Sequence, residues 1–408
     1  MKTYLTDQIR NIALMGNSGS GKTILAETML YLGGIIDRRG EIENGNTISD
    51  YHKIEHENEN SIFSTVLYTE WQDKKINIID NPGLDDFIGG AVTALHVCDS
   101  AIMMINAQNG VEVGTEIQSR YAEKVNKPFI FVLNHIDHDK ANFDKSYEML
   151  RERFGGNVVL VQYPVNPGTG FNTIIDLITM KQYTFPDGGG KAEISDIPAA
   201  EKDRAEELQA ELIEKAAESD EALMELFFEN ETLTEDEMIR GIAQGIVQRG
   251  IFPVFCISAK KNMGVDRLMD FIANIAPSPA ASPGIPTKDG ETKKIDPSGP
   301  ASLFVFKTSI ESHIGEINFF KVISGTITES MDLVNTCNYT KERFSQLFVS
   351  AGRNRTKVPK IVAGDIGATV KLKNTKTNHT VNAPGKDWVF NPIVYPEPKY
   401  RVAVRALS

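Results

Sequence analysis

A glycine-rich segment near the start of the chain has the residue types and spacing needed to bind phosphate groups. Glycines allow backbone N–H groups to close around phosphate oxygens without a Cβ clash. The lysine of such a segment can reach the β- and γ-phosphates of a nucleoside triphosphate, and the hydroxyl that follows it can bind Mg²⁺. The segment fits the pattern GxxxxGK[ST] and consists of Gly16, Asn17, Ser18, Gly19, Ser20, Gly21, Lys22 and Thr23. We expect these residues to bind a nucleotide, with Thr23 as a metal ligand.

The sequence on either side supplies the elements that must position this loop. Residues 10–15 form an apolar run typical of a strand, and residues 24–32 carry apolar side chains at helical spacing. Strand, glycine-rich turn and helix is the context that the pattern requires, and the helix N-terminus adds partial positive charge beside the phosphates. Residues 37–60 are polar and lack apolar periodicity, so we expect a long mobile loop there.

A carboxylate at the end of a later strand is the second expected metal ligand. Residues 65–70 and 76–80 are predicted to be strands, and the second ends at Asp80, three residues before Gly83. We expect Asp80 to hold Mg²⁺ through water and the Gly83 N–H to face the γ-phosphate.

Two further strand ends carry residues that can recognise a base. An apolar strand at 128–133 leads to Asn134, His135 and Asp137, and another at 253–257 leads to Ser258-Ala259-Lys260. The carboxylate of Asp137 can accept two hydrogen bonds from the N1–H and 2-amino groups of guanine, a pattern that adenine cannot supply. In this order after a phosphate loop, the two segments predict a guanine pocket.

Strands that alternate with helices predict an α/β fold with a mostly parallel sheet and a ligand at the carboxyl ends of the strands. The two base-binding segments are some 120 residues apart, too many for one strand and helix. We expect a P-loop GTPase domain at 1–157 and 251–280 and an inserted α+β subdomain at 158–250, with helices at 201–229 and 234–248. A linker at 281–300 and an all-β barrel at 301–392 are predicted to follow.

Composition and charge exclude some classes of function. The chain has 408 residues, 41% of them hydrophobic and 24% charged, as in ordinary globular proteins, and has no apolar run of membrane-spanning length. Three well-separated cysteines favour a reducing, cytoplasmic location. Residues 301–408 carry 15 Lys and Arg against 8 Asp and Glu, whereas residues 1–300 carry 28 against 47. This asymmetry indicates two surfaces with different partners.

Taken together, these motifs and the insertion give the sequence a resemblance to the translation elongation factor G family. The resemblance includes the four nucleotide motifs and extends into the insertion, whose residues 165–180, 197–199, 212–214 and 233–235 are similar to a subdomain peculiar to that factor. It continues through 261–265, 322–325 and 363–366. Residues 395–398 resemble the start of the family's third domain, which implies that residues 393–408 begin that domain and that the chain is an N-terminal fragment.

The resemblance implies a ribosomal function. Family members bind GTP or GDP with Mg²⁺, act on the ribosome, and move the tRNA–mRNA complex or help to recycle ribosomes. By this resemblance the acidic insertion would face the ribosomal stalk proteins, and the basic barrel would face rRNA, where it would neutralise phosphates. We expect a cytoplasmic monomer with no membrane partner.

Three departures from the family pattern lie in the catalytic half. The family has His after the glycine of DxPG to orient the attacking water, and this chain has Leu84. The family's first mobile loop ends in RGITI, and aligning it with residues 60–64 places Phe63 at the Thr that binds Mg²⁺. His135 replaces the Lys of NKxD. We therefore expect guanine-nucleotide binding with weak or absent GTP hydrolysis, and no confident catalytic residue.

Other interpretations stay open at this stage. Asp85 or His56 could replace the missing water-positioning group, and the protein would then be a fully active translocation GTPase. It could also be a non-catalytic ribosome-binding protection or regulatory factor. An ATP-using P-loop enzyme is opposed by Asp137 and by Ser258-Ala259-Lys260.

Overall fold

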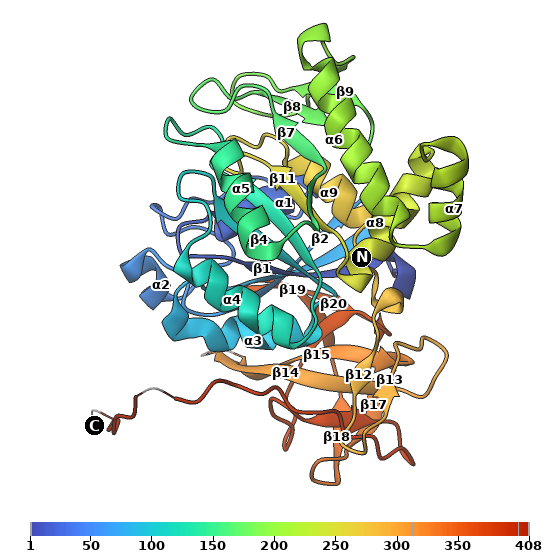
Figure 1. Ribbon diagram of the computed structural model, residues 1–408. Helices are drawn as coiled ribbons and strands as arrows, with labels where there is room; N and C mark the ends of the chain where they lie inside the picture. Colours follow the sequence, from blue (N-terminus) through green and yellow to red (C-terminus); the bar gives the residue numbers. More distant parts are fainter. Residues whose placement is uncertain (1, 312–313, 399, 407–408) are drawn as a thin grey trace.

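A seven-stranded sheet forms the centre of the first domain in the computed structural model, which describes residues 2–311, 314–398 and 400–406 (Figure 1). The strand order is β2-β3-β1-β4-β5-β11-β6, and every pair is parallel except β2 with β3. The strands are β1 (Ile9–Met15), β2 (Thr65–Trp71), β3 (Lys74–Asp80), β4 (Ser100–Asn106), β5 (Phe129–Asn134), β6 (Val158–Leu160) and β11 (Phe252–Cys256). The expected α/β fold is confirmed.

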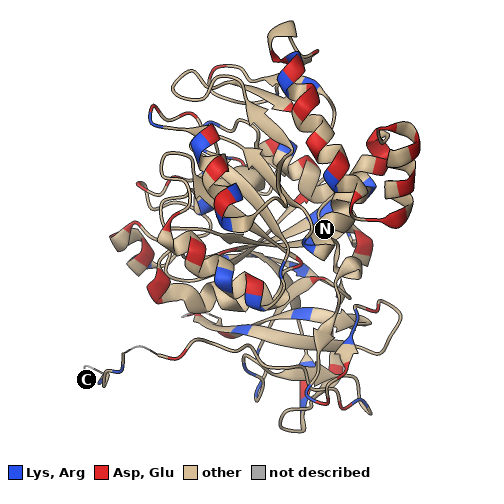
Figure 2. Ribbon diagram, viewed as in Figure 1, with Lys and Arg blue, Asp and Glu red and all other residues tan. Residues whose placement is uncertain are grey.

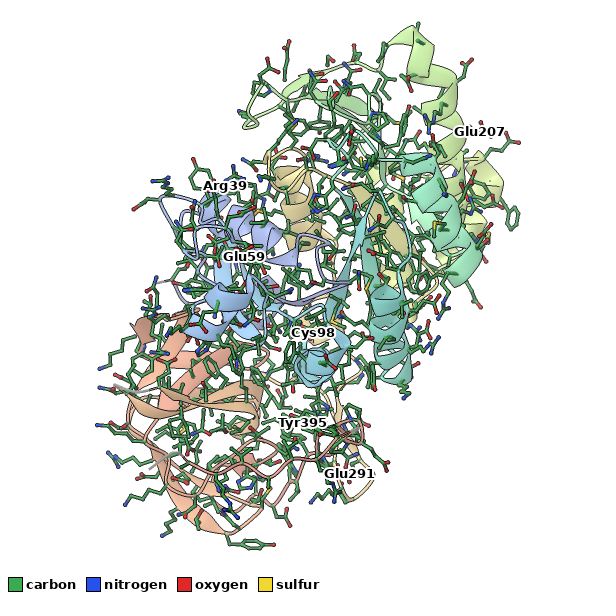
Figure 3. All side chains as sticks on the ribbon, turned by 90° about the vertical axis from the view of Figure 1, so that its left-hand side faces the viewer. Arg39, Glu59, Cys98, Glu207, Glu291 and Tyr395 are labelled. Atoms are coloured by element: carbon green, nitrogen blue, oxygen red, sulfur yellow. The ribbon has the colours of Figure 1, made fainter. Side chains whose placement is uncertain are left out.

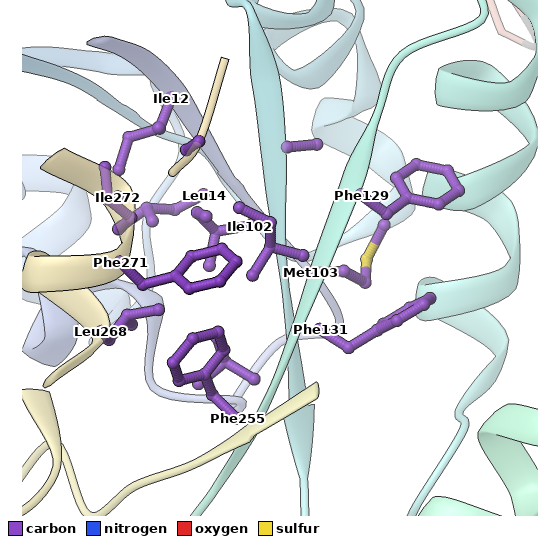
Figure 4. Packing of buried hydrophobic residues seen from close by; sticks show 14 of the residues in the cluster. Ile12, Leu14, Ile102, Met103, Phe129, Phe131, Phe255, Leu268, Phe271 and Ile272 are labelled. Carbon is purple, nitrogen blue, oxygen red and sulfur yellow. The ribbon is translucent and has the colours of Figure 1, made fainter. Parts of the chain in front are cut away.

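Helices cover both faces of this sheet. They are α1 (Lys22–Leu32), α3 (Ile88–Val97), α4 (Val113–Lys124), α5 (Phe143–Phe154) and α9 (Val265–Asn274). The adjacent side chains of Ile102 and Met103 point to opposite faces, toward Phe271 of α9 and toward Phe131 respectively (Figure 4). Because both faces are buried, the central strands are unbroken apolar runs rather than alternating ones.

The expected loop at 37–60 contains a short helix, α2 (Lys53–Asn58), and lies against the first domain. Ser49, Asp50 and Glu55 are buried within it, and the Glu27 carboxylate of α1 accepts a hydrogen bond from the Gly40 N–H at 2.8 Å. The segment lacks apolar periodicity because polar contacts rather than an apolar face hold it in place.

The insertion contains a four-stranded antiparallel sheet in the order β10-β9-β8-β7 and three helices. The strands are β7 (Gln162–Pro164), β8 (Thr173–Asp176), β9 (Lys181–Thr184) and β10 (Glu193–Ser195). The single helix expected at 201–229 is two helices, α6 (Ala199–Ala217) and α7 (Glu221–Asn230), because the Asp220 carboxylate caps a new helix start. The last helix, expected at 234–248, is α8 (Glu235–Gln248).

The boundary expected at residue 158 differs from the structure. Val158–Leu160 form β6, which pairs with β11 at the edge of the main sheet, so this strand belongs to the first domain rather than to the insertion. A buried apolar strand of three residues fits either sheet, and its pairing partner is set by tertiary packing.

The second domain is all antiparallel. Its main sheet has the order β18-β17-β23-β14-β15-β22-β19-β20, and β16 pairs with β21. The strands are β14 (Ser302–Glu311), β15 (Gly315–Ser324), β16 (Thr326–Thr328), β17 (Met331–Asn335), β18 (Thr340–Phe344), β19 (Leu347–Ala351), β20 (Asn354–Val358), β21 (Lys360–Val362), β22 (Ile366–Val370) and β23 (Thr380–Asn382). The linker expected at 281–300 includes a small hairpin of β12 (Ile285–Pro286) and β13 (Thr292–Lys293).

After residue 392 the described chain is extended and forms no helix or strand. Residues 399, 407 and 408 of the third-domain start expected at 393–408 lie outside the described residues. No helix in the part of the chain that the structure describes is both long and apolar enough to cross a membrane.

Buried ion pairs join the two domains. Lys75 of β3 contacts Asp365 at 2.7 Å, and Lys321 of β15 contacts Asp99 at 2.8 Å. Asn11 and Asn77 bridge them, because Asn11 donates to Asp99 and Asn77 donates both to Asn11 and to Asp365. The desolvation cost of a buried ion pair offsets much of its Coulombic gain, whereas removal of one partner leaves an uncompensated buried charge. The second domain is therefore anchored to the strand that ends in Asp80.

Candidate nucleotide-binding site

The phosphate loop connects β1 to α1 in a backbone conformation that needs glycine. Gly16, Gly19 and Gly21 have φ of 127°, 76° and 91°, and a Cβ on Gly16 would lie 2.3 Å from the Met104 carbonyl oxygen. The Lys22 ammonium donates to the carbonyl oxygens of Gly16 at 3.0 Å and Asn17 at 2.9 Å. Burial lowers the Lys22 pKa to about 8, against the opposing charge of Asp80. Lys22 is therefore held over the loop in which it is expected to bind phosphate.

Hydroxyl groups and carboxylates meet at the start of α1. Thr23 Oγ1 donates to Asp80 Oδ2 at 2.9 Å, and Ser49 Oγ donates to the same oxygen at 2.6 Å. Ser61 Oγ lies 3.2 Å from Thr23 Oγ1. The two residues expected to hold the metal, Thr23 and Asp80, are thus in direct contact.

Unsatisfied oxygens at this point fit a divalent cation. Oδ1 of Asp80 and Oδ1 of Asp50 are both buried and make no hydrogen bond within the described residues. Burial, followed by the neighbouring Asp80 charge, raises the pKa of Asp50 to about 7, and burial raises the pKa of Asp80. Oxygen donors of this kind suit Mg²⁺. The positive charge of the ion would favour the ionised form of both carboxylates. The residues present therefore fit the expected ion.

The register expected for the first mobile loop is wrong by two residues. Ser61, and not Phe63, faces Thr23, whereas Phe63 is 44% exposed and its ring lies 4.7 Å from that of His52. The backbone turns at Glu59, whose φ is 48°, and Asn60 accepts a hydrogen bond from Ser18 of the phosphate loop at 3.1 Å. A hydroxyl group is therefore retained where the resemblance implied its loss.

The second domain contacts this same loop. Lys307 of β14 donates to the Ser64 carbonyl oxygen. Burial lowers the Lys307 pKa to about 8, and the nearby Glu55 and Glu311 oppose that shift. Arg353 donates to the Tyr51 carbonyl oxygen at 3.3 Å. The segment that carries Ser61 is thus held from both domains.

The base-binding segments lie together beside the phosphate loop. Asn134 accepts a hydrogen bond from the Ala259 N–H at 3.0 Å and donates to the Ser20 carbonyl oxygen at 2.9 Å. His135 has φ of 63°, its Nε2 lies 3.2 Å from the Gly19 carbonyl oxygen, and burial lowers its pKa. Asp137 lies 3.6 Å from the Lys261 ammonium. Asn134 therefore connects the two base-binding segments, 134–137 and 258–260, to the phosphate loop.

A cavity of about 1220 Å³ extends along these elements. Its lining includes several of the expected residues, namely Ser18, Gly19, Gly21, Lys22, Thr23, Gly83, Asn134, His135 and Lys260. Gly16, Asn17, Ser20, Asp80, Asp137, Ser258 and Ala259 are outside that lining. Arg39 and Glu59 also line it and are labelled in Figure 3. Arg39 donates to the carbonyl oxygens of Ala259 and Lys260 at 3.1 and 3.0 Å, so the loop after α1 closes over the base-binding side.

Gln118 of α4 is a site residue that sequence reasoning missed. Its side chain is fully buried, and its Oε1 accepts from the Gly16 N–H at 2.7 Å. Its Nε2 donates to the carbonyl oxygens of Gly16 at 3.2 Å and Pro82 at 3.3 Å. One amide thus ties the phosphate loop to the segment that carries Gly83. A lone glutamine on a helix gives no signal in the sequence.

Leu84 follows Gly83 at the rim of the site. It is 39% exposed and precedes a short turn of 3₁₀ helix, η2 (Asp85–Phe87). Of the two proposed substitutes, His56 contacts the Asp50 carbonyl oxygen at 2.7 Å, while Asp85 Oδ1 is buried and makes no hydrogen bond within the described residues.

Comparison with known proteins agrees with this geometry. The family model "Elongation factor Tu GTP binding domain" matches residues 7–278, and "Elongation factor G domain 2" matches residues 300–383. A crystal structure of a protein from Thermus thermophilus is similar with a TM-score of 0.85 and 25% sequence identity. The match covers 96% of this chain and 57% of that one, so this chain spans little more than half of that protein's length. Since the first model matches well over half of the chain, the protein belongs to the family of GTP-binding translation elongation factors.

Proposed function

We propose that this chain is the GTP-binding part of an elongation factor G-like protein that acts on the ribosome in translocation, or in recycling, and hydrolyses GTP weakly or not at all. The observation that carries the proposal is Leu84. A leucine side chain cannot orient water, and it stands at the position where the resemblance implies the catalytic histidine. Loss of a positioned acid–base group typically lowers a rate about 10²- to 10⁴-fold.

The same proposal assigns binding to residues that the chain retains. Lys22 and the loop N–H groups would bind the β- and γ-phosphates, and Thr23, Asp80 and Ser61 would hold Mg²⁺, which would neutralise phosphate charge. Asp137 would read guanine. The hydrogen bonds between Thr23, Ser61 and Asp80 support a site organised for the ion in advance.

The expected partners follow the charge distribution. Acidic residues outnumber basic ones on α6 and α7 of the insertion (Figure 2), where a basic ribosomal stalk surface would fit. The second domain, with its excess of Lys and Arg, would contact rRNA phosphates. Movement of the tRNA–mRNA complex would need the further domains that the resemblance implies. A cytoplasmic monomer remains our expectation.

A fully active GTPase is the second candidate, and Asp85 favours it. Its Oδ1, one residue beyond Leu84, is buried and has no hydrogen-bond partner in the described part of the chain, so a local movement could aim a carboxylate at water. A non-catalytic protection or regulatory factor would differ from both candidates by acting without turnover.

Phosphate release by the full-length protein on ribosomes separates these candidates. We expect slow release by the natural protein, a large gain in Leu84→His, and no gain in the matched variant Leu84→Met. Brisk release by the natural protein that falls in Asp85→Asn would replace the proposal with the active GTPase. Mg²⁺-dependent GTP binding without any gain in Leu84→His would favour the non-catalytic factor.

A further inference from the structure

A second cavity, of about 590 Å³, lies at the opposite end of the sheet from the nucleotide site. Phe129 and Phe252, which line it, are the first residues of β5 and β11, whereas Asn134 of the nucleotide site is the last residue of β5. Its other walls come from the ends of α4, α5 and α8. The two cavities have separate linings, so this one is not an extension of the nucleotide pocket.

Two arginines in this lining are held by aromatic rings. The Arg249 guanidinium lies 5.9 Å from the centre of the Phe129 ring, and that of Arg153 lies 4.9 Å from the centre of the Phe154 ring. The two rings are 6.2 Å apart in an edge-to-face arrangement. Stacking of this kind restricts a guanidinium without using its N–H donors. Both arginines are therefore positioned with donors to spare.

The donors of these arginines are largely unused. Within the described residues neither guanidinium forms an ion pair with a carboxylate, and Arg153 makes no side-chain hydrogen bond. Among the residues that the structure describes, the Arg249 guanidinium donates once, to Asn126 Oδ1 at 3.1 Å, while its Nε is buried and makes no hydrogen bond. Glu123 is the acidic side chain in the lining, against the two arginines. A buried donor without an acceptor is costly, so an acceptor is expected there.

We propose that this cavity binds a small ligand through a phosphate or carboxylate group held by Arg153 and Arg249. Guanidinium N–H pairs match the geometry of such oxyanions and form short, charge-assisted hydrogen bonds with them. The rings of Phe129 and Phe252 leave an apolar wall beside that group. Arg249 follows the last helix of the insertion, and Phe129 begins a strand of the main sheet, so the ligand would contact both parts of the domain.

Binding of simple anions tests the proposal. The chain is saturated with GDP and Mg²⁺, which occupies the phosphate loop, and is titrated by calorimetry with inorganic phosphate and separately with acetate. We expect binding that weakens about 10- to 100-fold in Arg153→Met and in Arg249→Gly. Arg249 has φ of 61°, so glycine removes its side chain without straining the backbone. Preference for phosphate or for acetate identifies the group that the ligand carries.

A matched control keeps the test specific. Arg120 of α4 is exposed and paired with Glu116, so Arg120→Met removes one positive charge outside the cavity and should leave binding unchanged. Equal affinity in the natural chain, Arg153→Met and Arg249→Gly would overturn the proposal, as would failure of the folded natural chain to bind either anion. Because anion binding in this cavity is measured without GTP hydrolysis, the outcome of the titration is independent of the proposed function.

Discussion

Replacing Gln118 by methionine tests whether helix α4 sets the geometry of the γ-phosphate side. Methionine has a similar volume, so the change removes hydrogen bonds without opening a large cavity. The Gly16 N–H would lose its acceptor at 2.7 Å, and the carbonyl oxygens of Gly16 and Pro82 would lose donors at 3.2 and 3.3 Å.

The magnitude follows from the burial of these groups. An unsatisfied buried N–H costs about 1–3 kcal/mol, and each longer bond contributes about 0.5–1 kcal/mol. We expect the free energy of unfolding to fall by about 2–5 kcal/mol. Pro82 precedes Gly83, whose N–H is expected to face the γ-phosphate, so a GTP analogue should lose about 2- to 5-fold more affinity than GDP.

Nucleotide titrations of Gln118→Met with GDP and with a non-hydrolysable GTP analogue measure this difference, and denaturant unfolding measures the stability. Ser119→Ala is the control, because Ser119 is buried on the same helix and its hydroxyl, within the described ranges, bonds only to the Glu116 carbonyl oxygen. It should lower stability but keep the ratio of the two affinities. Equal losses for the two nucleotides in Gln118→Met would refute the coupling to the γ-phosphate side.

Two further changes test the loop that both domains hold. Ser61→Ala should weaken Mg²⁺-dependent binding of a GTP analogue about 2- to 10-fold, because it removes one hydroxyl beside Thr23. Phe63→Ala should leave this binding unchanged, because Phe63 is partly exposed and does not face Thr23. A larger loss in Phe63→Ala than in Ser61→Ala, measured by Mg²⁺ titration, would restore the register that the sequence indicated. The pKa of Lys307 is lowered to about 8 in the folded protein, so between pH 8 and about 10.5 the unfolded chain binds more protons and stability from this group rises with pH. In denaturant unfolding, the stability of the natural chain relative to Lys307→Met should therefore rise by roughly 1–3 kcal/mol from about pH 8 to pH 10; a constant difference would contradict it.

The sequence predicted the elements whose signals are local. The strand, glycine-rich loop and helix around Lys22 fall where the pattern placed them, because the motif and its flanking periodicity are contiguous. Ser49, Asp50 and Gln118 could not be predicted as site residues. Their position depends on tertiary contacts of a polar loop and of a separate helix, and neither carries periodicity toward the site.

Register was the least predictable feature. Ser61 and Phe63 are two residues apart, so in an extended segment both point to the same side, and apolar alternation cannot choose between them. The hydrogen bonds of Asn60 and Ser61 to the phosphate loop decide the choice, and they are contacts between segments some 40 residues apart. The prediction of a single helix across Asp220 was wrong for a different reason. In a stretch with helical apolar periodicity, a capping aspartate cannot be told from an exposed acidic residue within a helix.

The corrected register changes which step of GTP use is expected to be impaired. With Ser61 beside Thr23 and Asp80, the groups that would respond to Mg²⁺ and the γ-phosphate are present, so we expect the loop that carries Ser61 to distinguish GTP from GDP. The remaining departure at the catalytic end is Leu84, which we expect to affect the attacking water rather than nucleotide binding. Lys307 and Arg353 connect this loop to the second domain, so we expect a change in the bound nucleotide to reach that domain without hydrolysis. We therefore expect nucleotide binding and signalling to be separable from cleavage, and a substitution at Leu84 should alter turnover while leaving nucleotide discrimination at Ser61 intact.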